Sequence, residues 1–394
     1  MSSDVFICAP VRTAIGTFNG SLKNTPAPDL GAVVIRESLR RAALNSDTIQ
    51  TVVMGQVVQA GAGMNPARQA SIKGGLPVQV PAFTVNRVCG SGAQAIVSAY
   101  LEIISGNIDC AVAGGMENMD LGPYLLPSAR WGYRLGDGKV RDSVLLDGLH
   151  DIFSGQHSGW HTEDLASKYQ ISREQQDAWA LRSQQRFSKA QQAGDFKKEI
   201  VPVEIGSRKG IELFQQDEHN RADTTLEILA KLKPAFRPEG TITAGNAPGL
   251  NSGAAAMIIA NAKTVERYQL EPMARIVAYG IAAVEPGEFG IGPVPAVKQA
   301  LERSRWKLAE VERVEINEAF AAISVAVMSE LGLDESIVNV DGGAIAHGHP
   351  IGATGAILTT RLLYSMARDH LKKGIVTLCI GGGQGIALAL ERQA

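Results

Sequence analysis

Four side chains that could take part in a reaction lie beside glycine-rich or apolar turns in this sequence. Cys89 follows an apolar approach in "VNRVCGSGAQ", and His349 lies in "GHPIGATGA". Asn317 lies in "EINEAFAA", and Cys379 lies in "TLCIGGGQG". A cysteine attacks as its thiolate, which a nearby histidine and a helix N-terminus help to form. These residue types therefore permit covalent catalysis by a cysteine.

Each of these residues also has a purely structural interpretation. A cysteine in an apolar strand is usually a small hydrophobic filler, a histidine beside proline is a turn residue, and a buried asparagine caps a helix. Their shared placement at strand ends and helix starts favours a common site, because catalytic groups of open α/β folds gather at the carboxyl edges of strands. The residues by themselves leave both interpretations of Cys89 open.

Other motifs argue against a metal or a dinucleotide. His157 and His161 are spaced i, i+4, and His347 and His349 flank a glycine, but no carboxylate or cysteine cluster completes a ligand set. No metal site is predicted. "QAGAGMNPA" has Pro66 where a third glycine belongs, and "CIGGGQGIALALE" has too little chain after it for a βαβ unit, so a dehydrogenase is a poor interpretation.

The elements that must position these residues follow an α/β pattern. Short apolar runs such as "TVVMGQVV", "CAVAGG", "AAAMIIANA" and "IVTLCIGGG" predict strands that are covered on both faces. The segment after Cys89 reads as a helix with only a thin polar stripe, at Gln94, Ser98 and Glu102. A helix that is apolar almost all round must be buried.

The plan occurs twice along the chain. Each copy consists of a glycine-rich turn, an apolar helix, an apolar strand and a glycine cluster. The first copy runs from Cys89 through "DCAVAGGMENM", and the second is "HPIGATGAILTTRLLYSMARDHLKKGIVTLCIGGGQG". This similarity predicts a duplicated α/β unit whose two core helices lie back to back between two sheets. The turns of Cys89 and His349 would then face one another.

The middle of the chain has a different amino-acid composition. It is polar and charged, and Ser172, Gln175 and Gly194 predict a capped surface helix there. We therefore expect an N-terminal half at residues 1–120, continued at 251–270, an insertion at residues 121–250, and a C-terminal half at residues 271–394.

Composition sets the class and the compartment. The 394 residues are 45% hydrophobic and 20% charged with a formal net charge of -2, which gives no electrostatic case for nucleic acid or an anionic membrane. The four cysteines are widely spaced, which argues against a disulfide framework. With no signal peptide or membrane span recognised in the sequence, a cytoplasmic protein is expected.

The ordered motifs "PVRTAIGTFNGSL", "TVNRVCGSG", "GGMENM", "TAGNAPGLNSGAAA", "GIGPVPA", "NEAFAA", "GHPIGATGA" and "CIGGGQG" span essentially the whole chain. By these motifs the sequence resembles the thiolases of the biosynthetic, acetyl-CoA acetyltransferase type. The resemblance implies a duplicated five-layer αβαβα fold, an inserted loop domain that binds coenzyme A (CoA), and usually a tetramer built from dimers. It implies no resident cofactor, with CoA thioesters as substrates.

The resemblance also implies a role for each catalytic residue. Cys89 would accept the acyl group, His349 would activate Cys89, and Cys379 would remove the α-proton of the second acetyl-CoA. One oxyanion hole would consist of His349 and a water held by Asn317, and the other of the backbone amides of Cys89 and Gly381. The implied reaction joins two acetyl-CoA reversibly into acetoacetyl-CoA and CoA.

For CoA, the resemblance points to His157, Arg221, Ala244, Pro248 and Phe320. Arg221 has an equally good interpretation as a solvated surface charge. The family usually has serine at the position of Pro248 and methionine at the positions of Ser158 and Phe289, near the acyl pocket. Two alternatives are a 3-ketoacyl-CoA thiolase of broader chain length and a non-catalytic CoA-binding protein. The four aligned catalytic residues argue against the second.

Overall fold

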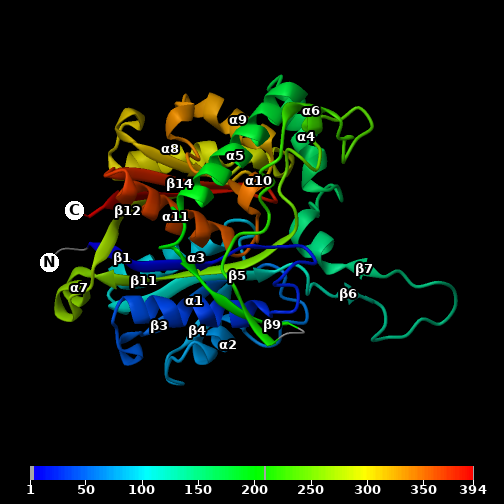
Figure 1. Cartoon of the computed structure of the whole chain (residues 1–394). Helices are drawn as coiled ribbons and strands as arrows, with labels where there is room; N and C mark the ends of the chain where they lie inside the picture. The colour runs from blue at the N-terminus through cyan, green and yellow to red at the C-terminus, as the bar shows by residue number, and fades with distance from the viewer. Residues whose placement is uncertain (1–3, 208–209, 394) are drawn as a thin grey trace.

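The computed structural model describes residues 4–207 and 210–393 and has five layers. Two helices lie between two layers of strands, and further helices cover the outer face of each strand layer (Figure 1). The five-layer αβαβα architecture expected from the sequence is therefore confirmed. Strand runs that are buried on both faces account for the near-continuous apolar segments of the sequence.

The N-terminal half contributes one layer of strands in the order β1-β11-β5-β3-β4. β3 lies between β5 and β4 and is parallel to both, while β11 is antiparallel to β1 and β5. β11 follows the insertion, so the chain returns to the N-terminal layer after it. The bounds are β1 (Val5–Thr13), β3 (Thr51–Gly55), β4 (Ala82–Val85), β5 (Cys110–Asn118) and β11 (Asn251–Asn261), with the short β2 (Gly16–Thr17) beside β11.

The C-terminal half repeats this arrangement. Its order is β12-β15-β14-β13, with β14 antiparallel to β15 and parallel to β13, as β5 is antiparallel to β11 and parallel to β3. A single parallel bridge from Val338 to Val314 stands where β4 stands in the first half. The duplication is thus visible in the strand register. The bounds are β12 (Pro272–Ala283), β13 (Arg313–Ile316), β14 (Lys373–Ile380) and β15 (Gln384–Arg392).

The two layers are not separate sheets, in contrast to the expectation from the sequence. β1 pairs with β12 over Phe6 to Cys8, and this short antiparallel contact joins all the strands of both halves into one 11-stranded sheet. The contact is confined to one end of β1 and contains a register shift. Beyond it the layers diverge, because the central helices lie between them.

The helices fill the remaining three layers. α3 and α11 form the middle layer, where their apolar side chains share one core with both strand layers. α1 and α2 cover the N-terminal layer, and α8 and α9 cover the C-terminal layer. The bounds are α1 (Ala27–Arg41), α2 (Pro66–Lys73), α3 (Ser91–Ile104), α7 (Ala262–Tyr268), α8 (Pro293–Ser304), α9 (Ala321–Leu331), α10 (Ala344–His347) and α11 (Thr354–Arg368), with shorter turns at η1 (Ser46–Thr48), η3 (Pro286–Ile291), η4 (Leu308–Glu310) and η5 (Glu335–Ile337).

Glycines let α3 and α11 meet backbone to backbone. A Cβ at Gly92 would lie 2.6 Å from the nitrogen of Ala356, and a Cβ at Gly355 would lie 2.4 Å from the nitrogen of Ala93. The first turns of the two helices therefore touch. Because Cys89 precedes α3 and His349 precedes α11, this close approach brings both residues to one place.

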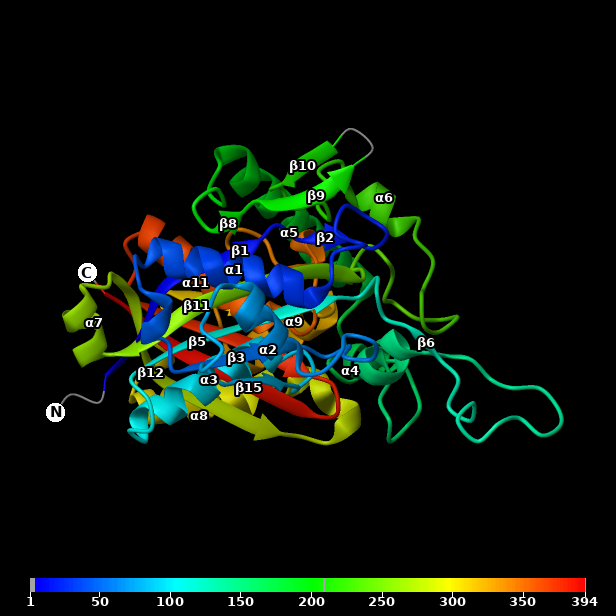
Figure 2. The same ribbon diagram turned by 90° about the horizontal axis from the view of Figure 1, so that it is seen from below.

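The insertion adds an extended arm, helices and a hairpin. The arm contains β6 and β7 and projects from the body of the molecule (Figures 1 and 2). The capping box of Ser172 and Gln175 and the left-handed Gly194 are confirmed at the ends of α5. α5 also buries Trp179 and Phe187 against the C-terminal half, so it is more than a surface helix. The bounds are β6 (Tyr124–Leu125), β7 (Arg141–Asp142), η2 (Leu145–Leu149), α4 (Ser158–Lys168), α5 (Arg173–Ala193), β8 (Ile200–Val201), β9 (Val203–Ser207), β10 (Gly210–Phe214) and α6 (Leu226–Ala230).

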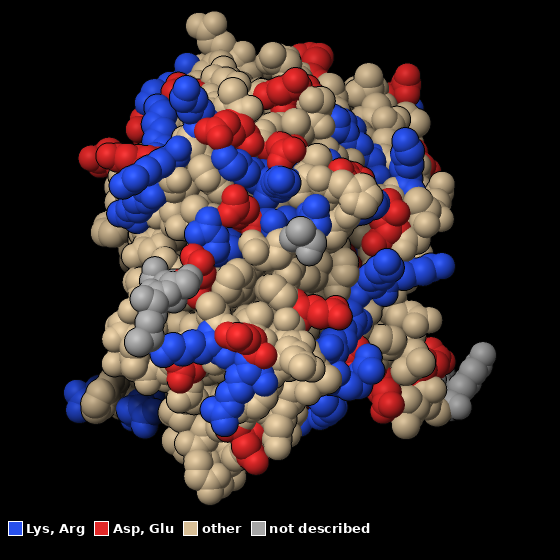
Figure 3. All heavy atoms as spheres, turned by 90° about the vertical axis from the view of Figure 1, so that its left-hand side faces the viewer, with Lys and Arg blue, Asp and Glu red and all other residues tan. Residues whose placement is uncertain are grey.

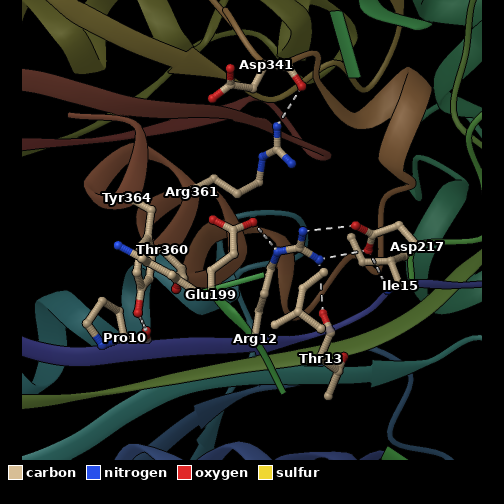
Figure 4. Close-up of polar contacts among 12 residues, drawn as sticks. Pro10, Arg12, Thr13, Ile15, Glu199, Asp217, Asp341, Thr360, Arg361 and Tyr364 are labelled. Carbon is tan, nitrogen blue, oxygen red and sulfur yellow. Dashed lines mark hydrogen bonds and ion pairs between the residues drawn. The ribbon is translucent and has the colours of Figure 1, made fainter. Parts of the chain in front are cut away.

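A buried arginine attaches the insertion to β1 (Figure 4). The Nε of Arg12 donates to Glu199 at 2.7 Å, and its two terminal nitrogens donate to the carboxylate of Asp217 at 2.8 and 2.9 Å. The Arg12 side chain is fully buried. Loss of one partner would leave an uncompensated buried charge, so the contact holds both ends of the β8–β10 segment in place.

The surface carries both signs of charge without segregation on the face that Figure 3 shows. This agrees with the small formal net charge. Across residues 4–207 and 210–393, no helix combines the length and the apolar content that a membrane crossing requires.

Candidate active site

A cavity of about 230 Å³ lies at the starts of α3 and α11. It is bounded by both halves of the fold and by the insertion, so no single segment of the chain forms it. Most of the residues singled out in the sequence line it: Cys89, His157, Pro248, Phe289, Phe320, His349 and Gly381. Asn317 and Cys379 are buried next to lining residues.

Cys89 lies in a strained turn between β4 and α3. Val88 has φ of 44°, a left-handed conformation that is rare for a β-branched residue. The hydroxyl of Ser91 stabilises the turn by accepting from the nitrogen of Arg87 at 2.8 Å and donating to the oxygen of Val88 at 2.7 Å. Strain of this kind persists where the surroundings enforce it, and here it accompanies a cysteine that lines the cavity.

Burial raises the pKa of the Cys89 thiol to about 11. The backbone amides of Gly381 and of Cys89 itself point at the sulfur and oppose this shift, while Glu117 adds to it. Cys89 is therefore a thiol at neutral pH, and attack requires a base that removes its proton. The two amides mark a place where negative charge beside the sulfur is stabilised.

His349 lines the same cavity as Cys89. Burial lowers the pKa of its imidazole to about 4, so the ring is neutral and able to accept a proton at neutral pH. Its backbone nitrogen donates to Oδ1 of Asn251 at 2.9 Å, which fixes the turn before α11. Its ring contacts Thr354 on one side and Asn317 on the other.

Asn317 connects the end of β13 to the cavity. Its backbone nitrogen donates to the oxygen of Thr377 at 3.0 Å, and its Nδ2 lies 3.3 Å from Nε2 of His349. Its Oδ1 is buried and has no hydrogen-bond partner among the described residues. A buried carbonyl without a protein partner is a suitable acceptor for an ordered water.

Cys379 lies near the end of β14, two residues before Gly381. Burial raises the pKa of its thiol well above the usual value, and the neighbouring Cys89 thiol raises it further. The Cys89 and Cys379 thiols therefore lie within electrostatic range of one another. A Cβ at Gly381 would meet only Val88, at 3.7 Å. Protein packing alone therefore leaves room for a side chain at 381.

Glu117 is a buried carboxyl that the sequence analysis did not identify. It accepts from the backbone nitrogens of Val57, Val58 and Gly352 at 2.9, 3.2 and 2.9 Å. Burial raises its pKa to about 7 despite these donors. Glu117 thereby holds together loops from both halves beside the cavity. A carboxylate at the end of the apolar run "AVAGGME" was the available signal.

One wall of the cavity is aromatic. His157 caps α4, since its Nδ1 accepts from the nitrogen of Gly159 at 2.9 Å, and its ring stacks on Phe236 at 4.6 Å. Phe236 in turn meets Phe320 edge to face at 5.9 Å. Phe236 was missed because nothing in its local sequence marks it. Arg221 and Ala244 are exposed and are not among the residues that line the cavity.

A second cavity of about 190 Å³ adjoins the first. The two share four lining residues, which are Gly148, Ser158, Phe289 and Gly381. Phe289 is 5% exposed and belongs to η3, while the hydroxyl of Ser158 donates to the oxygen of Leu149 at 2.8 Å. These side chains form a partition between the two spaces.

The chain matches two protein families in succession. Residues 5–263 match the thiolase N-terminal domain, and residues 270–392 match the thiolase C-terminal domain. The chain is 52% identical over 390 residues to the acetyl-CoA acetyltransferase of Pseudomonas aeruginosa, with 99% of each chain covered. It is 50% identical over 387 residues to that of Escherichia coli K12, with 98% of each covered.

Solved structures with the same fold carry two kinds of name. The Bacillus anthracis acetyl-CoA acetyltransferase superposes with a TM-score of 0.97 at 44% identity. Human mitochondrial 3-ketoacyl-CoA thiolase superposes with a TM-score of 0.97 at 41% identity. In both cases 99% of each chain is covered. The backbone fold alone therefore does not distinguish an acetyl-CoA acetyltransferase from a 3-ketoacyl-CoA thiolase.

Proposed function

The chain belongs to the thiolase family, and from this premise we propose that it is an acetyl-CoA C-acetyltransferase. The observation that carries the proposal is one cavity that brings together a thiol, a neutral imidazole and two backbone amides aimed at the sulfur, at Cys89, His349 and Gly381. Relatives named acetyl-CoA acetyltransferase at about half identity over the whole chain support the acetyl preference.

In the first half-reaction, His349 removes the thiol proton of Cys89 and the sulfur attacks the carbonyl carbon of acetyl-CoA. The C–S bond to CoA breaks, and CoA leaves as a thiol with the proton that His349 held. The product is acetyl-Cys89. One oxyanion-hole donor commonly contributes about 3 kcal/mol to such a step. The amides of Cys89 and Gly381 are our candidates for the donors that stabilise the negative charge that develops beside the sulfur.

In the second half-reaction, His349 takes the thiol proton of Cys379, and the Cys379 thiolate then removes the α-proton of a second acetyl-CoA. The resulting carbanion attacks the acetyl carbon, the bond to the Cys89 sulfur breaks, and acetoacetyl-CoA forms. The departing Cys89 thiolate takes the proton from His349, which restores the resting state of all three side chains. We propose that Nε2 of protonated His349 and a water on Oδ1 of Asn317 stabilise the thioester enolate. The free Oδ1 of Asn317 supports this role. The side chains carry the chemistry, with CoA thioesters as substrates rather than as resident cofactors.

We propose that CoA enters along the insertion. His157, Pro248 and Phe320 offer an aromatic and apolar wall to the pantetheine arm. Arg221 and Ala244 are exposed, and we assign them to the outer part of the CoA site, where a phosphate or the adenine would lie. On this proposal residues 121–250 form the CoA-binding loop domain between the two thiolase halves.

A 3-ketoacyl-CoA thiolase of broader chain length is the second candidate. The second cavity behind Phe289 favours it, because a longer acyl chain has a space to occupy if the partition moves. The buried position of Phe289 favours the acetyl-specific candidate instead.

We also propose a homotetramer in the cytoplasm. The arm around β6 and β7 exposes apolar side chains, with Trp131 at 84% and Leu135 at 99%. Exposed apolar surface of this kind is typical of a protein interface. All four cysteines are unpaired, which suits a reducing compartment. Sedimentation equilibrium of the purified protein tests the tetramer.

The experiment for the proposed reaction combines two measurements. Purified protein should thiolyse acetoacetyl-CoA, followed at the absorbance of its enolate. Brief exposure to acetyl-CoA should add one acetyl group to Cys89, identified by intact-mass and peptide spectrometry. Cys110→Ser, at a buried cysteine in β5, should keep the adduct, and Cys89→Ser should lose it. An acetyl group on Cys379, or none, would overturn the assignment.

A further inference from the structure

His349 makes a short contact on the side of its ring away from Asn317. Nδ1 of His349 lies 2.7 Å from the hydroxyl oxygen of Thr354 in the first turn of α11. Both side chains are buried. A neutral imidazole carries its proton on one nitrogen only, and the partner of the other nitrogen decides which one. Thr354 therefore has a part in setting the tautomer of the ring.

The hydroxyl proton of Thr354 already has an acceptor. Oγ1 of Thr354 donates to the carbonyl oxygen of Pro350 at 2.8 Å, four residues earlier. Thr359 and Thr360 make the same bond to the carbonyl four residues before them, at 2.8 and 3.0 Å. This is the usual bond of threonine inside a helix. The oxygen of Thr354 consequently presents a lone pair to Nδ1 of His349.

The opposite side of the ring leads to the same result. The Nδ2 amide group of Asn317 can only donate, and it lies 3.3 Å from Nε2 of His349. An amide donor faces a ring nitrogen that carries no hydrogen. Both contacts are thus compatible with a proton on Nδ1 and a lone pair on Nε2.

We propose that Thr354 is a positioning residue that holds neutral His349 as the Nδ1-protonated tautomer, so that Nε2 is the atom that accepts the proton of Cys89. The S–H bond of Cys89 breaks, its proton bonds to Nε2, and the electron pair stays on sulfur. The imidazolium then donates from Nδ1 to Thr354 without turning its ring. The proposal rests on the proposed function only for the identity of the proton donor.

The surroundings of His349 leave Thr354 as the polar group on the Nδ1 side. Cys89 and His157 are the titratable groups that line the same cavity as His349. Desolvation alone accounts for the lowered pKa of His349. The tautomer is therefore set by hydrogen bonds and not by a neighbouring charge.

The first measurement reads the tautomer directly. Protein labelled with ¹⁵N-histidine should show His349 with a protonated Nδ1 and a bare Nε2, in a resonance assigned by its loss in His349→Gln. Thr354→Ser should keep this pattern, because serine retains the hydroxyl. A proton on Nε2 of the unmodified protein would overturn the proposal whatever the variants do.

The second measurement reads the reactivity of Cys89 toward iodoacetamide, by peptide mass, between pH 7 and 10. Thr354→Val should slow alkylation at pH 7.5 by about tenfold or more, the loss typical when a group that orients a histidine is removed. The difference should shrink toward pH 10, where hydroxide takes the place of the base. Thr354→Ser should react within about threefold of the unmodified protein.

Thr359→Val is the matched control, because it removes the same helical hydroxyl bond in α11 without touching His349. It should leave the alkylation profile unchanged. Equal rates in Thr354→Val and the unmodified protein, or an equal loss in Thr359→Val, would refute the role of Thr354. Neither readout uses CoA. A protein that fails to form acetyl-Cys89 but shows these results would refute the proposed function and leave this inference standing.

Discussion

At the scale of single residues, burial determines the resting state of the site. It raises the pKa of both thiols and lowers the pKa of His349, so at neutral pH the free protein holds a neutral thiol and a neutral imidazole. An ion pair at rest is disfavoured because the cavity offers little solvation. On the proposed mechanism, charge develops only when substrate binds, beside the two backbone amides that face the Cys89 sulfur.

Cys379→Ala should separate the two half-reactions. We expect Cys89 to acquire an acetyl group as before, since Cys379 is assigned proton transfer and not attack. Condensation should fall by about 100-fold or more, the usual contribution of a general base. Cys110→Ala, another buried cysteine, should retain both activities. Condensation within about tenfold of the unmodified protein would show that Cys379 has another role.

Phe289 should control acyl chain length. We expect thiolysis of C4 3-ketoacyl-CoA to be preferred, C5 to be accepted and C8 to be poorly used, measured as kcat/KM. Phe289→Ala opens the first cavity toward the second, which adds about 190 Å³. The C8 to C4 ratio should then rise by at least about 10-fold to 100-fold, which is the effect of a single methylene at about 1 to 3 kcal/mol.

Phe236→Ala is the comparison for Phe289→Ala. Phe236 stacks on His157 and lines the first cavity but not the second, so its loss should reduce kcat/KM for all chain lengths alike. If the unmodified protein used C8 as well as C4, the broader 3-ketoacyl-CoA thiolase would replace the acetyl-specific proposal. Phe289→Ala should then leave the profile unchanged.

At the scale of elements, the meeting of α3 and α11 builds the site. The two helix starts carry Cys89 and the turn of His349, and glycine backbones at Gly92 and Gly355 allow their contact. Neither helix start would bring its candidate residue to the shared cavity without the other. A catalytic geometry formed by two close-packed helix starts is rigid, because the contact involves backbone atoms rather than flexible side chains.

Gly92→Ala should therefore destabilise the protein although alanine is the better helix former. The added Cβ would lie 2.6 Å from a backbone nitrogen of α11, and we expect a loss of about 3 kcal/mol in the free energy of unfolding. Gly206→Ala is the control, because a Cβ there meets nothing within 4 Å. Chemical denaturation checks both, and a Gly92→Ala protein as stable as the control would contradict the close contact.

At the scale of the whole molecule, buried titratable groups couple folding to pH. Burial lowers the pKa of His157, His219 and His349 to about 4, and that of His347 well below its usual value. As pH falls from 6.5 toward 4, the unfolded chain binds protons at these histidines and the folded protein does not. Stability should fall over this window.

Two buried carboxyls have the opposite effect on how stability depends on pH. Burial raises the pKa of Glu117 to about 7 and of Glu315 to about 8. Between pH 4.5 and these values the folded protein keeps a proton that the unfolded chain has released, so their contribution to stability is lost as pH rises. The histidines outnumber them, and the net effect between pH 5 and 6.5 should be a loss of stability toward acid.

Glu315→Gln tests this balance. Both oxygens of Glu315 are buried without a hydrogen-bond partner among the described residues. The substitution removes an ionisation that favours unfolding, so we expect it to stabilise the protein at pH 7 by about 1 to 3 kcal/mol. The gain should shrink toward pH 5. Glu302→Gln, at an exposed position, should change neither value. A gain independent of pH would contradict the buried ionisation.

Much of the fold and the reactive centre could be predicted from the sequence. Apolar runs indicated the buried strands, and the repeated glycine-turn and helix pattern indicated the duplicated halves with two central helices. Both signals are local, because each depends on residues that are neighbours in the chain. The same local motifs singled out Cys89 and His349 as candidates, and the structure places both on one cavity.

Only the tertiary structure decided the remaining features. It joined the two layers through β1 and β12, paired Thr354 with His349, set Glu117 between loops of both halves, and separated two cavities with Phe289. Glu117 and Gly352 are more than 200 positions apart in the chain. Contacts of this kind depend on how closely distant backbones pack, and no local pattern of residues encodes that distance.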